Sequence, residues 1–184
     1  MNAITDAEII QKISSRERSA FDLLYDRYAS IIFNLCVRIL NDRNEAEDVM
    51  QEIFLQVWRE AGRFDSARAS VKTWLFTIAR SRSLDRYRSR KNIQKRLDSN
   101  AGENLQMMAS EEDLQKRSLL QKYVGTALGQ LSEEQRKVLE LSYYEGLTQE
   151  EISEKLNEPL GTIKSRIRSG LIKLRSLFSG GGVE

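Results

Sequence analysis

The densest group of residues able to do chemistry is a run of cations between positions 80 and 96. The run consists of Arg80, Arg82, Arg86, Arg88, Arg90, Lys91, Lys95 and Arg96. Arginine and lysine bind phosphate oxygens through charge-assisted hydrogen bonds. An apolar stripe at helical spacing overlaps the start of the run, so we expect a rigid helix with cations on its remaining faces. A solvated basic face on an ordinary core helix is the competing interpretation, and this segment alone leaves both open.

An irregular segment at residues 64–70 precedes this predicted helix and mixes small, polar and basic side chains. Such a loop beside a cationic helix suits opened, single-stranded DNA, because the cations hold phosphates and a loop pocket accepts an unstacked base. The helix must be positioned by its buried stripe. That stripe is predicted to contain Trp74, Leu75, Ile78, Ala79 and Leu84.

The sequence excludes several kinds of chemistry. It contains no histidine, and Cys36 is its only cysteine, so disulfides, zinc sites and histidine acid–base catalysis cannot be built. Cys36 lies in an apolar run and is expected to be a buried core residue. Asp48 and Glu52 stand four positions apart and could hold a metal in a nuclease, but nothing else in the chain supports that site. We therefore predict no catalytic residue, metal, cofactor or small-molecule substrate.

Charge is segregated along the chain although the net charge is only +2 over 184 residues. Acidic residues gather at 45–52, 103–113 and 133–151, and basic residues at 80–96 and 164–175. Local basic faces bind phosphate whatever the total charge. No signal peptide and no apolar run of membrane-spanning length is found, so we expect a cytoplasmic protein without direct membrane insertion.

The apolar periodicity predicts an all-α fold of two small helical domains. Helices are expected at 6–13, 16–40 and 45–61, followed by the cationic helix, and no sustained alternation indicates a sheet. Residues 98–111 lose periodicity and are predicted to be a flexible linker. The domains are therefore placed at 1–97 and 112–178, with a disordered tail at 179–184. Gly62 is expected to end the third helix.

The helix at 45–61 has more large apolar residues than one buried stripe needs. Ala46, Val49, Ile53 and Val57 account for the stripe, whereas Met50, Phe54, Leu55 and Trp58 spread around it beside carboxylates. Such a surplus is typical of a surface that docks another protein. Plain core packing explains it equally well at this point.

The second domain ends in a predicted helix-turn-helix. A helix at 149–156, opened by a Thr148–Glu151 capping box, is followed by a turn at 157–161 and by a helix that Thr162 caps and that runs to about Phe178. The buried stripe of the last helix is predicted to be Ile163, Ile167, Leu171, Leu174 and Phe178. Lys164, Ser165, Arg168 and Ser169 then share the exposed side where a recognition helix meets base edges, with Arg166, Lys173 and Arg175 beside it for phosphates. Ordinary packing of two helices is the alternative, and the basic face favours DNA.

Together these motifs resemble those of bacterial extracytoplasmic-function sigma factors, the smallest members of the sigma-70 superfamily. The resemblance covers nearly the whole chain. It rests on residues 21–28 (FDLLYDRY), 46–58 (AEDVMQEIFLQVW), 64–65, 73–75, 78–80, 147–153 (LTQEEIS) and 159–166 (PLGTIKSR).

The resemblance implies sigma region 2 in the first domain and region 4 in the second. It implies that core RNA polymerase is bound by Glu47, Asp48, Gln51, Glu52, Leu55 and Trp58. The minus-ten element of the promoter would be bound by Asp65, Ser66, Arg68, Ser70, Trp74, Arg80, Ser81, Arg82 and Arg86. The minus-thirty-five element would be bound by Thr162, Lys164, Ser165, Arg166, Arg168, Ser169 and Lys173.

Two positions depart from the family pattern. Family members commonly have asparagine where this chain has Ser81, and many carry arginine near Ser169. Serine reaches less far and cannot make a bidentate contact with guanine, so these differences bear on the promoter sequence rather than on the activity.

The predicted function is that of a non-enzymatic alternative sigma factor. It would direct promoter recognition, promoter melting and transcription initiation, with an anti-sigma factor as a further partner that the resemblance implies. The alternative is a stand-alone helix-turn-helix regulator, which would bind a palindrome as a dimer without polymerase.

Overall fold

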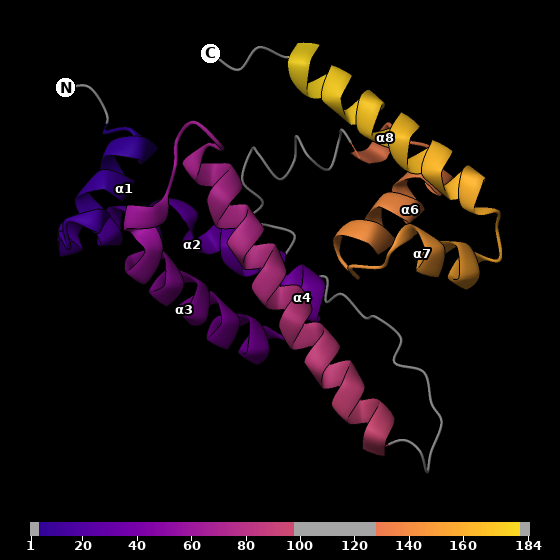
Figure 1. The fold of residues 1–184 in the computed structure, drawn as a ribbon, viewed down its shortest axis with the longest axis horizontal. Helices are drawn as coiled ribbons and strands as arrows, with labels where there is room; N and C mark the ends of the chain where they lie inside the picture. The colour runs from indigo at the N-terminus through magenta and orange to yellow at the C-terminus, as the bar shows by residue number, and fades with distance from the viewer. Residues whose placement is uncertain (1–3, 98–127, 181–184) are drawn as a thin grey trace. The chain divides into compact units, whose positions relative to one another are not determined.

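The computed structural model describes residues 4–97 and 128–180, and the chain divides into two compact units, Met1–Met107 and Met108–Glu184. The regular structure of these described residues consists of α-helices and a short 3-10 helix and contains no strand (Figure 1). The all-α prediction is therefore confirmed. The linker predicted at 98–111, residues 112–127 of the predicted second domain and residues 181–184 of the predicted tail lie outside the described residues.

The first unit contains α1 (Asp6–Ser14), α2 (Arg18–Leu40), α3 (Arg43–Glu60), a short 3-10 helix (Ala61–Arg63) and α4 (Val71–Leu97). Figure 1 shows them from indigo to pink. Helix α1 begins with a capping box, in which the Thr5 hydroxyl accepts from Glu8 N and the Glu8 carboxylate accepts from Thr5 N at 2.8 Å. These hydrogen bonds to the Thr5 backbone and side chain hold the pKa of Glu8 below its usual value.

The turn between α2 and α3 follows from two residues that suit it. Asn41 adopts a left-handed conformation with φ of 52°, and its N–H donates to Val37 C=O, which closes α2. Asp42 then accepts a hydrogen bond from Glu45 N at 3.0 Å and caps α3. The prediction that Gly62 ends this helix is wrong by two residues, because α3 ends at Glu60 and Gly62 lies inside the 3-10 turn without a positive φ.

The core of the first unit contains most of the stripes predicted for α3 and α4. Val49, Ile53 and Val57 on α3 are fully buried, and on α4 Leu75 and Ala79 are fully buried too. Ile78 and Leu84 are also buried, while Trp74 is half-buried at the edge. Cys36 is in the core as expected, and burial raises the pKa of its thiol.

Helix α1 is attached to α2 by a polar contact as well as by its apolar side chains. The Asp6 carboxylate accepts hydrogen bonds from Arg27 and from the Tyr28 hydroxyl. Burial, together with this hydrogen bond, raises the pKa of Tyr28. The contact fixes α1 across the N-terminal half of α2.

The second unit contains α6 (Glu133–Tyr143), α7 (Gln149–Leu156) and α8 (Leu160–Gly180). The predicted capping box that joins Thr148 to Glu151 is present, and a second one joins Ser132 to Gln135 at the start of α6. Asn157 ends α7 in the left-handed conformation, with φ of 52°. The helix-turn-helix expected from the sequence is therefore formed by α7, the turn at Asn157 and α8.

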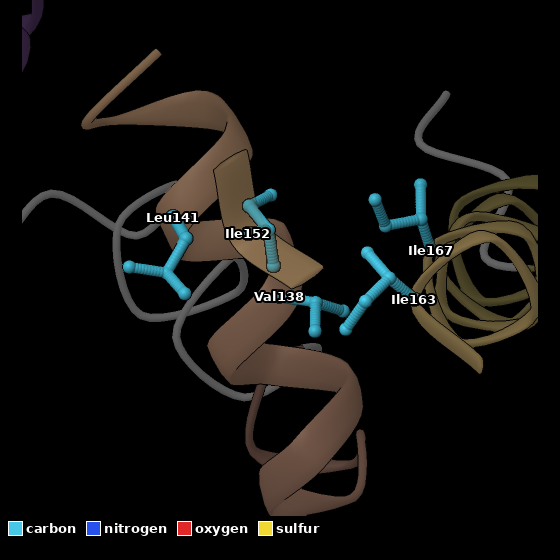
Figure 2. Packing of buried hydrophobic residues seen from close by; sticks show 5 residues of the cluster. All are labelled: Val138, Leu141, Ile152, Ile163 and Ile167. Carbon is cyan, nitrogen blue, oxygen red and sulfur yellow. The ribbon is translucent and has the colours of Figure 1, made fainter. Parts of the chain in front are cut away.

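A small apolar core holds α6, α7 and α8 together. Val138 and Leu141 from α6 and Ile152 from α7 meet Ile163 and Ile167 from α8 (Figure 2). Figure 2 shows the two α8 isoleucines reaching from their helix toward Val138 and Ile152. Leu139, Leu147 and Leu156 pack around this cluster.

Two details of α8 differ from the prediction. The helix begins at Leu160, and Pro159 C=O accepts from the N–H groups of Thr162 and Ile163, so Thr162 lies in the first turn and is not the cap. Leu171 is 53% exposed and does not belong to the buried stripe. Gly170 occupies the buried position in its place, where an added Cβ would lie 2.9 Å from Leu139 Cδ1. The stripe therefore runs through 163, 167, 170 and 174.

Candidate docking and nucleic-acid surfaces

One face of α3 carries all six residues predicted to bind polymerase. At 3.6 residues per turn these positions share a side of the helix opposite Ala46, Val49, Ile53 and Val57. Five of the six are exposed, and Trp58 is half-buried. We call this surface the α3 docking face; it consists of Glu47, Asp48, Gln51, Glu52, Leu55 and Trp58.

The surplus of large apolar residues on α3 divides between core and surface. Phe54 is only 2% exposed and packs against the rings of Phe21 and Tyr25, with centroids 6.1 Å and 4.8 Å away. Leu55 is 57% exposed in the middle of the α3 docking face. Phe54 is thus explained by packing, whereas Leu55 is an apolar side chain edged by carboxylates, which suits a protein contact.

Trp58 is anchored at the end of the α3 docking face. Its ring makes an edge contact with Phe21 at 5.4 Å, and the Arg16 guanidinium lies 5.5 Å from its centroid. Arg16 also donates to Trp58 C=O at 2.8 Å. A fixed aromatic ring loses little conformational entropy when a partner covers it.

The loop at residues 64–70 is tied down at both ends by its own polar groups. The Asp65 carboxylate accepts from Ala67 N at 2.9 Å, and the Ser70 hydroxyl accepts from Thr73 N at 3.2 Å as a cap of α4. Ser66 and Arg68 between them are exposed. Asp65 and Ser70 therefore shape the loop and leave Ser66 and Arg68 on its outer side.

Trp74 joins this loop to α4. Its ring lies 5.3 Å from that of Phe64, and it is half-buried. Ser81 is exposed, and Arg80 lies two residues before Arg82, which places it on nearly the opposite side of α4. The residues predicted to bind the minus-ten element are consequently divided between two sides of this helix.

The cations on the other side of α4 face polar groups of α3. Arg82 Nε donates to Gln56 Oε1 at 2.8 Å, and Arg86 donates to the Glu52 carboxylate at 2.7 Å. Glu52 thus contacts a residue predicted to bind DNA while itself belonging to the α3 docking face. The two predicted sites meet at this contact.

Arg90 makes a third contact between the helices and is more firmly held. It donates to the Glu45 carboxylate at 3.0 Å and to Leu40 C=O at 2.8 Å. A cation at the last carbonyls of a helix is favoured by the helix dipole. We call the three pairs Gln56–Arg82, Glu52–Arg86 and Glu45–Arg90 the α3–α4 ladder.

On α8 the centre of the exposed side carries Lys164, Ser165 and Arg168. These three lie opposite the buried stripe of Ile163 and Ile167 and are all exposed. None of them makes a side-chain hydrogen bond or ion pair with another residue in the described ranges. We call them the α8 open face.

The remaining α8 residues of the predicted site lie on one flank of the helix and contact the protein itself. Arg166 pairs with Glu158, Ser169 accepts a hydrogen bond from Gln135 Nε2 at 2.9 Å, and Lys173 donates to Gln130 C=O. Thr162 is half-buried on the same flank. We call Thr162, Arg166, Ser169 and Lys173 the α8 flank. The predicted set is therefore brought together on one helix but divides into an open part and a paired part.

Sequence reasoning missed several partners of the predicted site residues and of Arg90. Glu45, Gln56 and Glu158 hold the cations Arg90, Arg82 and Arg166, and Gln135 donates to the hydroxyl of Ser169. Each comes from another helix or from the turn before α8, so periodicity within one helix could not identify it. The acidic segment at 45–52 was the one available signal, since it predicted acids on α3 but not which cations they face.

Within the described ranges, no group of three or more acidic or cysteine side chains is arranged to hold a metal ion. Every helix in the described parts of the chain is too short or too polar to cross a bilayer.

Two family models match the chain, one in each unit. The model described as Sigma-70 region 2 matches residues 24–93, which span most of α2, then α3 and most of α4. The model described as Sigma-70, region 4 matches residues 127–176, which contain α6, α7 and most of α8.

Similar proteins cover nearly the whole chain. The chain is 37% identical over 175 residues to the ECF RNA polymerase sigma factor SigK of Mycobacterium sp. (strain KMS), covering 94% of this chain and 90% of that protein. It is 36% identical over 169 residues to SigK of Mycobacterium tuberculosis (strain H37Rv), covering 91% and 90%. Among solved structures, Rhodobacter sphaeroides SigE in complex with the anti-sigma ChrR is 29% identical, with 95% and 99% coverage and a TM-score of 0.49.

Proposed function

The chain belongs to the extracytoplasmic-function sigma factors of the sigma-70 family, and on this premise we propose how its surfaces share the work of transcription initiation. It is an alternative sigma factor, which gives RNA polymerase its promoter specificity. Synthesis of RNA belongs to the polymerase, and the chain contributes binding and no catalytic step of its own. We place its action in the cytoplasm, where polymerase and DNA are found.

The α3 docking face is proposed to bind core RNA polymerase. Its central Leu55 is 57% exposed, and the carboxylates of Glu47, Asp48 and Glu52 lie exposed on the same face. An apolar centre with a charged rim is the usual anatomy of a protein interface, and acidic rims favour a basic partner surface.

The loop and α4 are proposed to bind the opened minus-ten element. Asp65 and Ser70 fix the loop, so that Ser66 and Arg68 meet the DNA without first having to be ordered. On α4 the proposed contacts are made by Trp74, Arg80, Ser81, Arg82 and Arg86. Each captured base contributes about 1–3 kcal/mol when it stacks on an aromatic ring.

The α8 open face is proposed to read the minus-thirty-five element in the major groove. Lys164, Ser165 and Arg168 point away from the core and have no partner among the described residues, which is the observation that carries the assignment. The α8 flank would then contact phosphates beside them. Linking two weak DNA contacts through one polymerase makes the combined site selective, because the second contact forms at a high effective concentration.

An anti-sigma factor is the further partner we propose, on the basis of family membership. It would cover polymerase-binding surface and so keep the factor silent. Purification of the tagged chain from its host under non-inducing conditions is expected to yield a small protein in stoichiometric amount. Recovery of the chain with polymerase alone under every condition would count against this partner.

Run-off transcription with purified core polymerase tests the proposed function. The full chain plus core is expected to give discrete transcripts from genomic fragments, whereas core alone gives none. Leu55→Ala is expected to weaken core binding by about tenfold, as a central interface residue does. Leu23→Ala is the matched control, because Leu23 is an exposed leucine of the same unit outside the α3 docking face. Absence of any promoter-directed transcript would refute the proposal.

A further inference from the structure

Glu52 belongs to two surfaces at once. Successive residues turn by about 100° around a helix, which places Glu52 at the edge of the α3 docking face next to the side that carries Glu45 and Gln56. Its carboxylate accepts from Arg86 of α4 at 2.7 Å. The side chains of Glu52 and Arg86 are 47% and 33% exposed, so an incoming partner can reach either of them.

The pair alters the charge that Arg86 presents to DNA. A guanidinium has five N–H donors, and the hydrogen bond to Glu52 uses one nitrogen, so other donors stay available. The carboxylate nevertheless cancels the net charge. Phosphate binding depends on charge, because each phosphate neutralised by a cation releases condensed counterions. Glu52 and a DNA phosphate therefore compete for the same cation.

The other pairs of the α3–α4 ladder do not join an acid of the α3 docking face to a cation predicted to bind DNA. Arg82 is held by the neutral amide of Gln56 and keeps its full charge. Arg90 is fixed by Glu45 and by Leu40 C=O, on the side of α3 that faces α4 rather than on the docking face. Only Arg86 within the ladder has a charge that is set by an acid of the α3 docking face.

We propose that Glu52 couples polymerase docking to DNA binding by holding Arg86 in the free protein and releasing it when polymerase engages the α3 docking face. The proposal rests on the proposed function of that face. A basic group of the polymerase that pairs with Glu52 leaves Arg86 with its full charge toward the opened strand. The coupling is reciprocal, since a phosphate on Arg86 equally frees Glu52 for polymerase.

The solvent exposure of the Glu52–Arg86 pair limits how much Glu52 can change the affinity for DNA. An exposed ion pair changes an equilibrium by at most about fivefold. Glu52 is therefore a bias on DNA affinity and not an absolute block. One additional neutralised phosphate steepens the dependence of log affinity on log salt by about 0.7 for single strands.

Single-strand binding by the free full-length protein tests this coupling. The probe is a fluorescein-labelled single strand of about 12 nucleotides, followed by anisotropy between about 50 and 200 mM salt. Glu52→Gln is expected to bind about two- to fivefold more tightly than wild type, with the steeper salt dependence. Asp22→Asn is the matched control, because it removes the same charge from an exposed α2 side chain with no partner in the described ranges.

A second variant distinguishes the effect of Glu52 on Arg86 from the general effect of removing one negative charge. Glu52→Gln combined with Arg86→Gln is expected to bind no more tightly than Arg86→Gln alone. The coupling is overturned if Glu52→Gln still raises the affinity for the single strand when Arg86 is absent. It is also overturned if Glu52→Gln and Asp22→Asn bind the single strand with equal affinity. Weaker binding by Glu52→Gln overturns it as well, since the carboxylate would then be positioning Arg86 for DNA.

The release step is tested with saturating core polymerase. Wild type and Glu52→Gln are expected to have equal single-strand affinity once bound to core. A higher affinity of Glu52→Gln in the core complex would contradict the release of Arg86 by polymerase. The free-protein result does not depend on polymerase. A run-off assay without transcripts would therefore contradict the proposed function, while the Glu52–Arg86 competition could still be observed in the free protein. Transcripts in the run-off assay together with unchanged single-strand binding by Glu52→Gln would contradict the coupling alone.

Discussion

Helices α4 and α8 both carry cations predicted to meet DNA, and they present them in opposite ways. On α8, Lys164 and Arg168 project from the side opposite the core with no partner among the described residues. On α4, Arg82 and Arg86 are each bonded to a side chain of α3. A helix that reads duplex DNA can present its cations before any strand opening, because duplex DNA is accessible from the start. The helix proposed to meet DNA only after strand opening has two of its cations occupied by the protein.

The largest effect is expected from a substitution that destabilises the second unit and leaves the first unit folded. Ile163→Ala deletes a fully buried side chain from the small core of the second unit, which should destabilise that unit by about 2–5 kcal/mol. Hydrogen exchange measured by mass spectrometry should rise in peptides of α6, α7 and α8. Peptides of α2 and α3, which have their own core, serve as the internal control. Unchanged exchange throughout the second unit would contradict the described packing.

The next effect distinguishes the α8 open face from the α8 flank. Arg168→Ala should cost the polymerase complex about 1–3 kcal/mol of promoter affinity if Arg168 contacts a base edge. Lys173→Ala is the comparison, because Lys173 already donates to Gln130 C=O and is proposed to contact only phosphate. Its loss should be smaller and similar for all sequences. Equal and sequence-independent losses in both variants would argue against base reading by Arg168.

A smaller effect distinguishes two pairs of the α3–α4 ladder. Glu45→Gln weakens the contact that fixes Arg90, and this should lower the stability of the first unit by up to about 1 kcal/mol. Urea denaturation followed by circular dichroism gives that value. Single-strand binding by the folded variant should equal that of wild type, in contrast to the increase expected for Glu52→Gln. An equal increase in both variants would remove the distinction between a structural pair and a coupling pair.

The smallest effect concerns Ser169. Its hydroxyl accepts from Gln135 and donates to Arg166 C=O, so we expect Ser169→Ala to change stability by about 0.5 kcal/mol, at the low end for a hydrogen bond. The set of promoters used in run-off transcription should stay the same. A changed set of start sites would show that Ser169 reads DNA despite its contact with Gln135.

Much of the fold could be predicted from local sequence signals. The capping box at Thr148 and the turn that begins at Asn157 lie where the pattern placed them, and Asn41 lies in the predicted interruption between the second and third helices. These signals are local, because a cap satisfies backbone groups within a few residues. The interruption at 41–44 was predictable for the same reason.

The error at Leu171 shows the limit of apolar periodicity. A pattern search selects large side chains, so it chose Leu171 and passed over Gly170 beside it. The helices approach so closely there that a Cβ on Gly170 would contact Leu139 at 2.9 Å, and only glycine fits without displacing that side chain. The packing partner, on another helix, decides which of two neighbours is buried.

The side-chain contacts between α3 and α4 could not be predicted for a related reason. Gln56 and Arg82 are 26 positions apart, Glu52 and Arg86 are 34 apart, and Glu45 and Arg90 are 45 apart. Which acid meets which cation depends on how the two helices cross, and the sequence of either helix alone does not contain that information. The site residues were predicted as sets, and their division into open and paired groups came from the structure.

Whether promoter binding by this chain depends on polymerase is measured by adding core polymerase to a mixture of the full chain and a labelled promoter fragment, with gel mobility as the readout. We expect the chain alone to form no stable complex at physiological salt, and a discrete complex to form once core is added. A tight, sequence-specific shift by the chain alone, or no chain-dependent shift in the presence of core, would contradict this dependence.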